Sequence, residues 1–322
     1  MRRRDFVALL SSVAAWPLTT RAQQRIPRVG ILVAGASPPP ADFELTQQLA
    51  RIGYIDGRNI TYEIRGADGE IARLPPLARE LVAKNPDVLV GSTTPAAIAL
   101  AAATHDIPIV MMVVGDPIAL GLSNSIARPS GNVTGFTASS VSLAAKRLEL
   151  LRELVPGLRK IAYLWVPANP MTRGFAEEVR KAAGALGIEL VSLPLKSSED
   201  IGAAFTLAEK EQVMAVLVES DELTVRNSGS ITDECSVRNL PAMHAWPFEA
   251  KNGALISYGP ATAENFARTA IYVDRILKGA KVAELPFEEP TQIRLAINLR
   301  TARSIKISVP PALLARADEV IE

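Results

Sequence analysis

The sequence predicts an α/β protein of two Rossmann-like lobes, each with a parallel sheet covered by helices. Two observations support this prediction. Short apolar runs alternate with helical segments twice along the chain, as in repeated βαβ units. Corresponding positions also recur at a nearly constant offset: Ile31 and Tyr163 are 132 residues apart, and Gly53 and Gly187 are 134 apart. The alternative is chance spacing within an ordinary βα protein.

The composition fits a globular protein of about two domains and excludes several functional classes. The chain has 322 residues, is 48% hydrophobic and carries a net charge of +1. The hydrophobic content excludes a disordered chain, and the near-neutral charge gives no basic surface for binding nucleic acid. Cys235 is the only cysteine, and His105 and His244 are the only histidines, which leaves little material for a disulfide or a metal site. We therefore expect a protein that handles a small molecule without a metal.

Residues 1–22 are predicted to be a signal peptide. They begin with Arg2, Arg3 and Arg4, continue with an apolar run over 6–18 and end in the small residue Ala22. The run is shorter than the ~20 residues that a membrane-spanning helix needs. The segment Arg3-Arg4-Asp5-Phe6-Val7 is similar to the twin-arginine export pattern, and a general secretory signal is the alternative. Either route predicts a periplasmic protein.

The first lobe is predicted from alternating strands and helices after residue 27. Its strands are short apolar or β-branched runs, as buried parallel strands are, and Gly53 ends its first helix. We expect strands at 29–33, 59–64, 87–90 and 107–114, and helices at 42–52, 77–84 and 94–104.

The second lobe repeats this order, and Gly187 ends its first helix as Gly53 does in the first lobe. We expect strands at 160–166, 188–194, 215–219 and 240–243, and helices at 175–186, 201–210 and 230–238. In such sheets ligands bind beyond the carboxyl ends of the strands, so two facing lobes place these loops around one cleft.

The loops that follow the strands offer hydroxyl, carboxylate and aromatic side chains. Ser92, Thr93 and Thr94 precede a helix, where hydroxyls and free N–H groups suit a carboxylate or phosphate. Simple helix capping is the alternative. Asp116 and Asp221 suit a cationic group such as an ammonium, with turn formation or a helix start as the alternative.

Trp246 and Phe248 are predicted to form an apolar or stacking wall, unless they are core residues. No sequence signature of an enzyme accompanies these candidates. The chain has no G-x-G-x-x-G turn, P-loop, H-E-x-x-H, C-x-x-C or G-x-S-x-G motif. His244 has no nucleophile at a recognisable spacing. We therefore predict binding without catalytic residues or a cofactor.

Several longer segments together resemble one family. They are the leader MRRRDF…RAQQ, GYIDGRNITYEIR (53–65), LPPLARELV (74–82), GDPIALGL (115–122), SGNVTGF (130–136), KRLELLRELVP (146–156), ISYG (256–259), RILKG (275–279) and the C-terminal VPPALLARADEVIE. Over the whole chain the sequence resembles the substrate-binding components of ABC transporters, in the tryptophan/tyrosine-type family with the type I periplasmic-binding-protein fold.

The resemblance implies a monomeric protein whose lobes close on an amino acid or carboxylate, such as an aromatic amino acid. Its closed form would then dock on an ABC permease in the inner membrane. At the positions that match the family, the residues implied to bind the ligand are Ser37, Ser92, Thr93, Thr94, Asp116, Asn169 and Asp221. The chain departs from the family in two places. It has Ser92-Thr93-Thr94-Pro95 where members often read Gly-Thr-Pro-Ala, and 219–224 lacks the usual aromatic residue.

The resemblance also implies three chain crossings between the lobes. The first lobe would comprise 27–118 and 258–285, and the second 135–250 and 291–322. The hinge would lie near 115–137, 246–260 and 280–295. A strand at 254–258 would return to the first lobe, a helix would follow at 261–277, and 291–298 would cross back.

Two other functions share parts of this description. One is a ligand-sensing module for a membrane receptor, and the other is an exported α/β hydrolase. A DNA-binding regulator is excluded, because the leader has no room for a helix-turn-helix ahead of the first strand.

Overall fold

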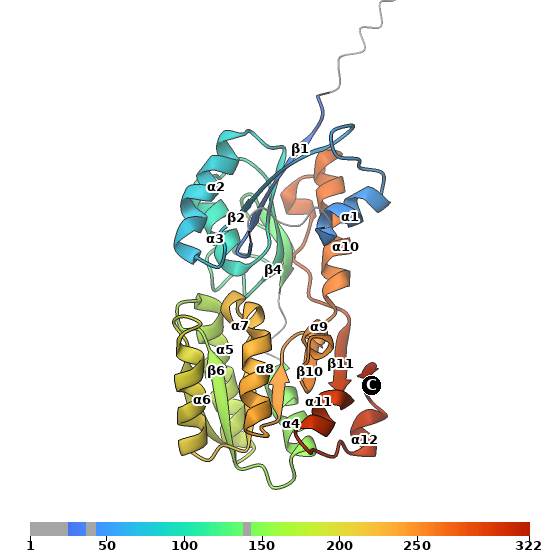
Figure 1. Ribbon diagram of the computed structural model, residues 1–322. Helices are drawn as coiled ribbons and strands as arrows, with labels where there is room; N and C mark the ends of the chain where they lie inside the picture. The colour runs from blue at the N-terminus through green and yellow to red at the C-terminus, as the bar shows by residue number, and fades with distance from the viewer. Residues whose placement is uncertain (1–24, 37–42, 138–142) are drawn as a thin grey trace, which may run out of the picture.

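The computed structural model describes residues 25–36, 43–137 and 143–322, and it contains two lobes stacked end to end (Figure 1). The predicted signal peptide and Ser37 lie outside the described residues. None of the helices within the described ranges is both long and apolar enough to cross a bilayer.

The first lobe is built on a five-stranded parallel sheet of order β2-β1-β3-β4-β5. Its strands are β1 (Arg28–Val33), β2 (Thr61–Gly66), β3 (Val88–Gly91), β4 (Ile109–Val114) and β5 (Val133–Thr137). Its helices are α1 (Glu44–Arg51), α2 (Leu74–Ala83), α3 (Thr94–Ala103) and α10 (Thr262–Leu277). α1 and α10 pack side by side on one face, although they lie far apart in the sequence (Figure 1). α2 and α3 cover the other face, so the strands are buried on both sides, which explains their apolar runs.

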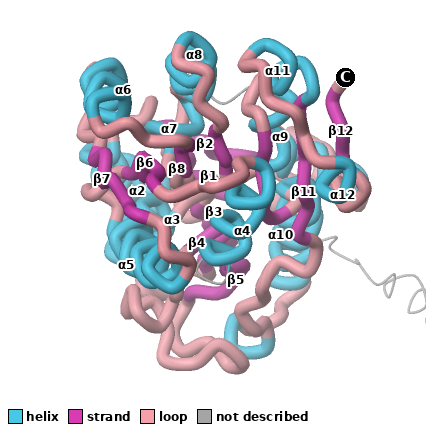
Figure 2. Tube along the Cα trace, turned by 90° about the horizontal axis from the view of Figure 1, so that it is seen from below, coloured by secondary structure: helices cyan, strands magenta, loops and turns pink. Residues whose placement is uncertain are grey.

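The second lobe has a seven-stranded sheet of order β12-β11-β10-β9-β8-β6-β7. Its strands are β6 (Lys160–Trp165), β7 (Glu189–Pro194), β8 (Ala215–Val218), β9 (Ala242–His244), β10 (Ile256–Pro260), β11 (Ile293–Asn298) and β12 (Glu319–Ile321). Its helices are α4 (Ala144–Leu154), α5 (Pro170–Ala185), α6 (Asp200–Lys210), α7 (Glu222–Arg226), α8 (Ser228–Val237), α9 (Pro247–Lys251), α11 (Leu299–Ser304) and α12 (Pro311–Leu314). Figure 2 shows α6 and α8 on one side of β7, β6 and β8, with α4 and α5 on the other, each pair over its own apolar core.

The predicted repeat is confirmed by the strand order. The order β2-β1-β3-β4 in the first lobe corresponds to β7-β6-β8-β9 in the second. Ile31 on β1 and Tyr163 on β6 occupy equivalent central positions, because each is paired on both sides by the next two strands of its lobe. Gly53 and Gly187 follow α1 and α5 with φ of 99° and 68°. That left-handed conformation favours glycine and ends a helix.

Two expectations about the hinge are wrong. β10 was expected to return to the first lobe, but it pairs with β9 in parallel and with β11 in antiparallel, so it belongs to the second sheet. β5 pairs with β4 and extends the first sheet, so 133–137 belongs to the first lobe. The sequence predicted a strand at 254–258 but none at 133–137, and a strand-forming run does not specify which sheet will bury it.

The crossings therefore lie after Thr137, after Pro260 and before Ile293. Two hydrogen bonds bring these connecting segments together. The Thr137 N–H donates to the Glu288 carbonyl (2.9 Å), and the Ala261 N–H donates to the Gln292 carbonyl (3.0 Å). Connections that run side by side in this way favour a bending hinge between the lobes.

Candidate functional site

A cavity of about 280 Å³ lies between the lobes, at the carboxyl ends of their parallel strands. Its volume is near the lower end for ligand pockets, about 300–1,000 Å³, and suits a small solute. It brings together six of the predicted site residues: Ser92, Thr93, Thr94, Asn169, Asp221 and Trp246.

Asp116 does not line this cavity. Its side chain is exposed, and its Oδ1 accepts hydrogen bonds from the N–H groups of Ile118 (2.8 Å) and Ala119 (3.2 Å). Its carboxylate therefore stabilises a turn, which was the alternative interpretation of this residue. Ser37, which was also predicted to bind the ligand, lies outside the described residues.

The first lobe presents the start of α3 to the cavity. Thr93 occupies the N-cap position, yet its side chain makes no capping hydrogen bond. Its Oγ1 is buried and has no hydrogen-bond partner in the described part of the chain. An unengaged hydroxyl beside the first N–H groups of a ten-residue helix suits a carboxylate.

Thr94 is engaged differently. Its Oγ1 accepts from the Gly115 N–H (3.1 Å) and donates to Met171 Sδ (3.3 Å). Gly115 belongs to the first lobe and Met171 to the second, so the Thr94 hydroxyl helps to hold the lobes together.

The second lobe presents a linked amide and carboxylate, Asn169 and Asp221, which are 4% and 6% exposed. Asn169 caps α5, because its Oδ1 accepts from the Met171 N–H (3.0 Å). Asp221 caps α7, because its Oδ1 accepts from the Leu223 N–H (2.9 Å). Asn169 Nδ2 also donates to Asp221 Oδ2 (2.8 Å). A carboxylate has about four lone-pair sites, so Asp221 can still accept from a ligand ammonium.

Glu222 also lines the cavity, although it was not predicted from the sequence. Burial raises the pKa of its carboxyl, the positive charge of Arg226 opposes this, and Asp221 raises the pKa further. Among the described residues that line the cavity, none is Lys or Arg. Two neighbouring carboxylates, with Arg226 outside the lining, make this side of the cavity suitable for a cationic group. The signal in the sequence was the position of Glu222, directly after Asp221 in a strand-end loop.

Two aromatic pairs line the cavity, one on each lobe. Trp246 and Phe248 lie nearly parallel, with ring centroids 6.5 Å apart and an interplanar angle of 13°. Phe43 and Phe266 pack edge to face at 5.9 Å. The second pair was not predicted from the sequence, because Phe43 directly precedes α1 and Phe266 lies on α10, and these segments meet only in the folded lobe.

Hydrogen bonds at both ends of Trp246 fix its orientation. Its Nε1 donates to Ser220 Oγ (2.5 Å), and its backbone N–H donates to Glu249 Oε2 (2.9 Å). The Ser220 N–H donates to Glu219 Oε1 (3.1 Å). The buried Glu219 pairs with Arg147, and the distance from Glu219 Oε1 to Arg147 Nη1 is 3.9 Å. A buried ionic network therefore lies behind the aromatic wall and holds Ser220, the partner of Trp246.

Direct contacts join the lobes around the cavity. The Arg226 guanidinium on α7 donates to the Asp68 carbonyl of the first lobe. Glu222 lies against Gly35 so closely that a Cβ on Gly35 would be 3.0 Å from Glu222 Oε1. With the contact between Thr94 and Met171, these interactions describe a closed arrangement.

The cavity thus combines an unengaged hydroxyl at a helix start on the first lobe, carboxylates on the second and aromatic side chains on both. In the described ranges, His, Cys, Asp and Glu side chains form no group of three that could hold a metal ion.

Comparisons with known proteins show which sequences and folds this chain is similar to. A sequence profile described as "ABC transporter substrate binding protein" matches residues 43–321. A tyrosine-binding protein of Clostridioides difficile (strain R20291) is 26% identical over 271 residues, which cover 83% of this chain and 77% of that protein.

Two solved structures are similar along most of the chain. A conserved domain protein from Vibrio cholerae O1 biovar El Tor is 27% identical, with a TM-score of 0.84 over 92% of this chain and 100% of that one. An ABC domain from Streptococcus pneumoniae in complex with L-Trp is 25% identical, with a TM-score of 0.82 over 92% of this chain and 99% of that one.

Proposed function

Since the chain belongs to the ABC transporter substrate-binding protein family, we propose that it is the exported solute-binding component of an ABC import system and captures an aromatic amino acid. One observation carries this proposal. Asp221 and Glu222 on one lobe, and Thr93 at the start of α3 on the other, line the same cavity with the aromatic pairs. The tyrosine-binding relative and the L-Trp complex support the same ligand class.

In this function the ligand ammonium binds to Asp221 and Glu222, and its carboxylate binds to Thr93 Oγ1 and the first N–H groups of α3. The aromatic side chain lies between Trp246 and the Phe43–Phe266 pair. Because both lobes contact the ligand, binding favours the closed state. A few charge-assisted hydrogen bonds and one buried ring are sufficient for a micromolar dissociation constant, about −8 kcal/mol.

The protein acts in the periplasm, to which the leader over residues 1–22 directs it. It works as a monomer and delivers the ligand to an inner-membrane permease that recognises the closed lobes. The ligand is released chemically unchanged. The family supports the role in an ABC import system, and the leader sequence supports export.

Calorimetry on residues 23–322 tests the proposal. L-Trp, L-Tyr and L-Phe are compared with tryptamine, which lacks the carboxylate, and with indole-3-propionate, which lacks the ammonium. We expect micromolar binding of at least one amino acid, at least about tenfold weaker binding of both analogues, and a raised melting temperature with the ligand. The proposal is wrong if no aromatic amino acid binds, or if tryptamine and indole-3-propionate bind as tightly as L-Trp.

A further inference from the structure

Asn265 lies on the first turn of α10 and lines the cavity beside Phe266. It is 2% exposed, and neither its Nδ2 nor its Oδ1 has a hydrogen-bond partner in the described part of the chain. Buried amides are normally hydrogen-bonded, and an unpartnered one is destabilising. A leucine would fill this volume without that cost, so the amide needs an explanation in terms of binding.

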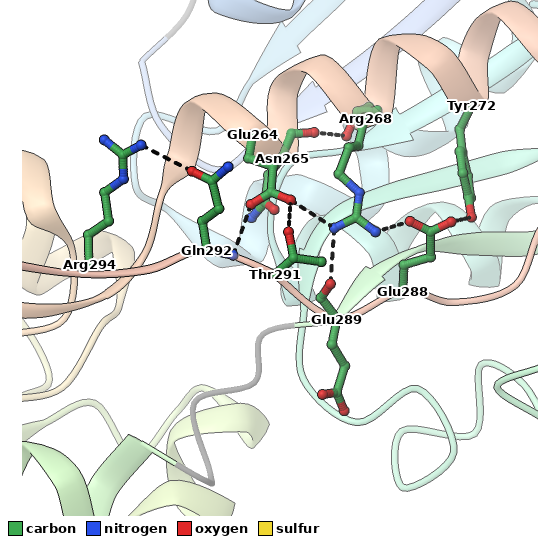
Figure 3. Close-up of polar contacts among 10 residues, drawn as sticks. Glu264, Asn265, Arg268, Tyr272, Glu288, Glu289, Thr291, Gln292 and Arg294 are labelled. Carbon is green, nitrogen blue, oxygen red and sulfur yellow. Dashed lines mark hydrogen bonds and ion pairs between the residues drawn. The ribbon is translucent and has the colours of Figure 1, made fainter.

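The polar neighbours of Asn265 on α10 are engaged elsewhere (Figure 3). Glu264 accepts from the Thr291 hydroxyl and from the Gln292 N–H (3.2 Å). Arg268 pairs with Glu288 and donates to the Glu289 carbonyl. These contacts fasten the start of α10 to the segment that crosses between the lobes. They hold Asn265 in place at the cavity wall without using its side chain.

The charged groups of an amino-acid ligand already have matching partners. Thr93 and the start of α3 suit its carboxylate, and Asp221 and Glu222 suit its ammonium. A carboxylate would satisfy only Nδ2 of Asn265, and an ammonium only Oδ1. A neutral group that both donates and accepts, such as a hydroxyl, matches the chemistry of the amide.

We propose that Asn265 is a specificity-determining residue that hydrogen-bonds a hydroxyl-like polar group on the ligand side chain, and so selects a phenol over an unsubstituted ring. The inference rests on the proposed function and adds the identity of the side-chain contact. Phe43 and Phe266 would contact the ring, and Asn265 its polar end. A ligand without this group would leave the amide buried and unpaired, which is the strongest basis for discrimination between similar ligands.

The experiment measures L-Tyr and L-Phe binding by calorimetry, with wild-type protein, Asn265→Leu and Asn124→Leu. Asn124 is an exposed residue of the same lobe outside the cavity, so its variant is the matched control. We expect wild type and Asn124→Leu to bind L-Tyr about 10- to 100-fold tighter than L-Phe. Asn265→Leu should lose this preference by weakening L-Tyr, while L-Phe binding is kept or improved.

The wild-type comparison needs no variant, so the test does not depend on the folding of Asn265→Leu. Equal wild-type affinities for L-Tyr and L-Phe would overturn the inference and leave the proposed function intact. An unchanged preference in a folded Asn265→Leu would overturn it too. If neither amino acid nor L-Trp binds the wild-type protein, the proposed function and the inference fail together.

Discussion

The side-chain amide of Asn169 donates a 2.8 Å hydrogen bond to the carboxylate of Asp221, and each of the two residues also caps the helix that follows it. The starts of α5 and α7 are thereby tied together in the wall of the cavity. The amide fixes the position of the carboxylate without neutralising its charge, so Asp221 stays available to a cation.

Asp221→Asn should therefore weaken binding of an aromatic amino acid by about 10- to 100-fold, because a charge-assisted hydrogen bond to the ammonium becomes a neutral one. Calorimetry measures the change. Asp116→Asn is the matched control, since Asp116 stabilises a turn and does not line the cavity, and its affinity should stay within about twofold of wild type. Equal losses in both variants would place the ammonium site elsewhere.

Affinity should depend on pH through Glu222. Burial raises the pKa of this carboxyl above its ordinary value, so it takes up a proton at a higher pH than an exposed glutamate. An ammonium binds best to the ionised form. Affinity should therefore fall as the pH drops through the raised pKa, with proton release on binding.

The dissociation constant measured from about pH 7 to about pH 5 tests this, because the α-carboxyl and α-amino groups of the ligand titrate mainly outside that range. Glu222→Gln should bind more weakly at neutral pH and show a flatter profile. An identical pH dependence in the variant would assign the effect to another group.

Thr93→Val should affect stability and binding in opposite directions. The variant removes a buried hydroxyl that has no partner among the described residues, so the free protein should keep or raise its melting temperature. The same change should weaken ligand binding about tenfold, because the carboxylate loses a donor. Thr94→Val is the comparison and should lower the melting temperature, since Gly115 and Met171 lose their partner. A Thr93→Val protein that melts earlier and binds normally would show that the hydroxyl is structural.

Ligand binding should change the fluorescence of Trp246. After the leader, the chain has only two tryptophans, Trp165 and Trp246. Trp165 donates to Ser192 on the edge strand β7 and does not line the cavity, whereas Trp246 does. Trp165→Phe should retain the ligand-dependent change and Trp246→Phe should abolish it. If the fluorescence change is lost in Trp165→Phe and kept in Trp246→Phe, the ligand does not bind in this cavity.

Gly35→Ala should hinder closure of the lobes. The added Cβ would lie 3.0 Å from Glu222 Oε1, so the second lobe must shift when the cavity closes. We expect affinity to fall about tenfold, as for a small overpacking defect, and small-angle scattering to show less compaction with ligand. Gly202→Ala, where a Cβ meets nothing within 4 Å, is the control and should bind as wild type. If the Gly35→Ala protein compacts normally with ligand, the contact between Gly35 and Glu222 does not control closure of the lobes.

Local patterns in the sequence predicted the first four strands of each lobe, most of the helices between them and several of the loops that line the cavity. The bounds of β6 follow from its apolar run and the end of α5 follows from Gly187, because strand burial and helix termination act over a few residues. The loops that contain Thr93, Asn169, Asp221 and Trp246 could be selected because ligands of parallel sheets bind beyond the strand ends.

The sequence by itself therefore determined two α/β lobes and the strand-end loops that face their cleft. Only the tertiary structure decided that β10 joins the second sheet, that Asp116 turns away from the cavity, and that Phe43, Glu222 and Asn265 face it. The reason is physical. An apolar or polar pattern states that a side chain needs burial or a partner, but the partner is chosen by packing between segments that are distant in the sequence, as when α10 lies against α1 and Arg226 reaches the Asp68 carbonyl.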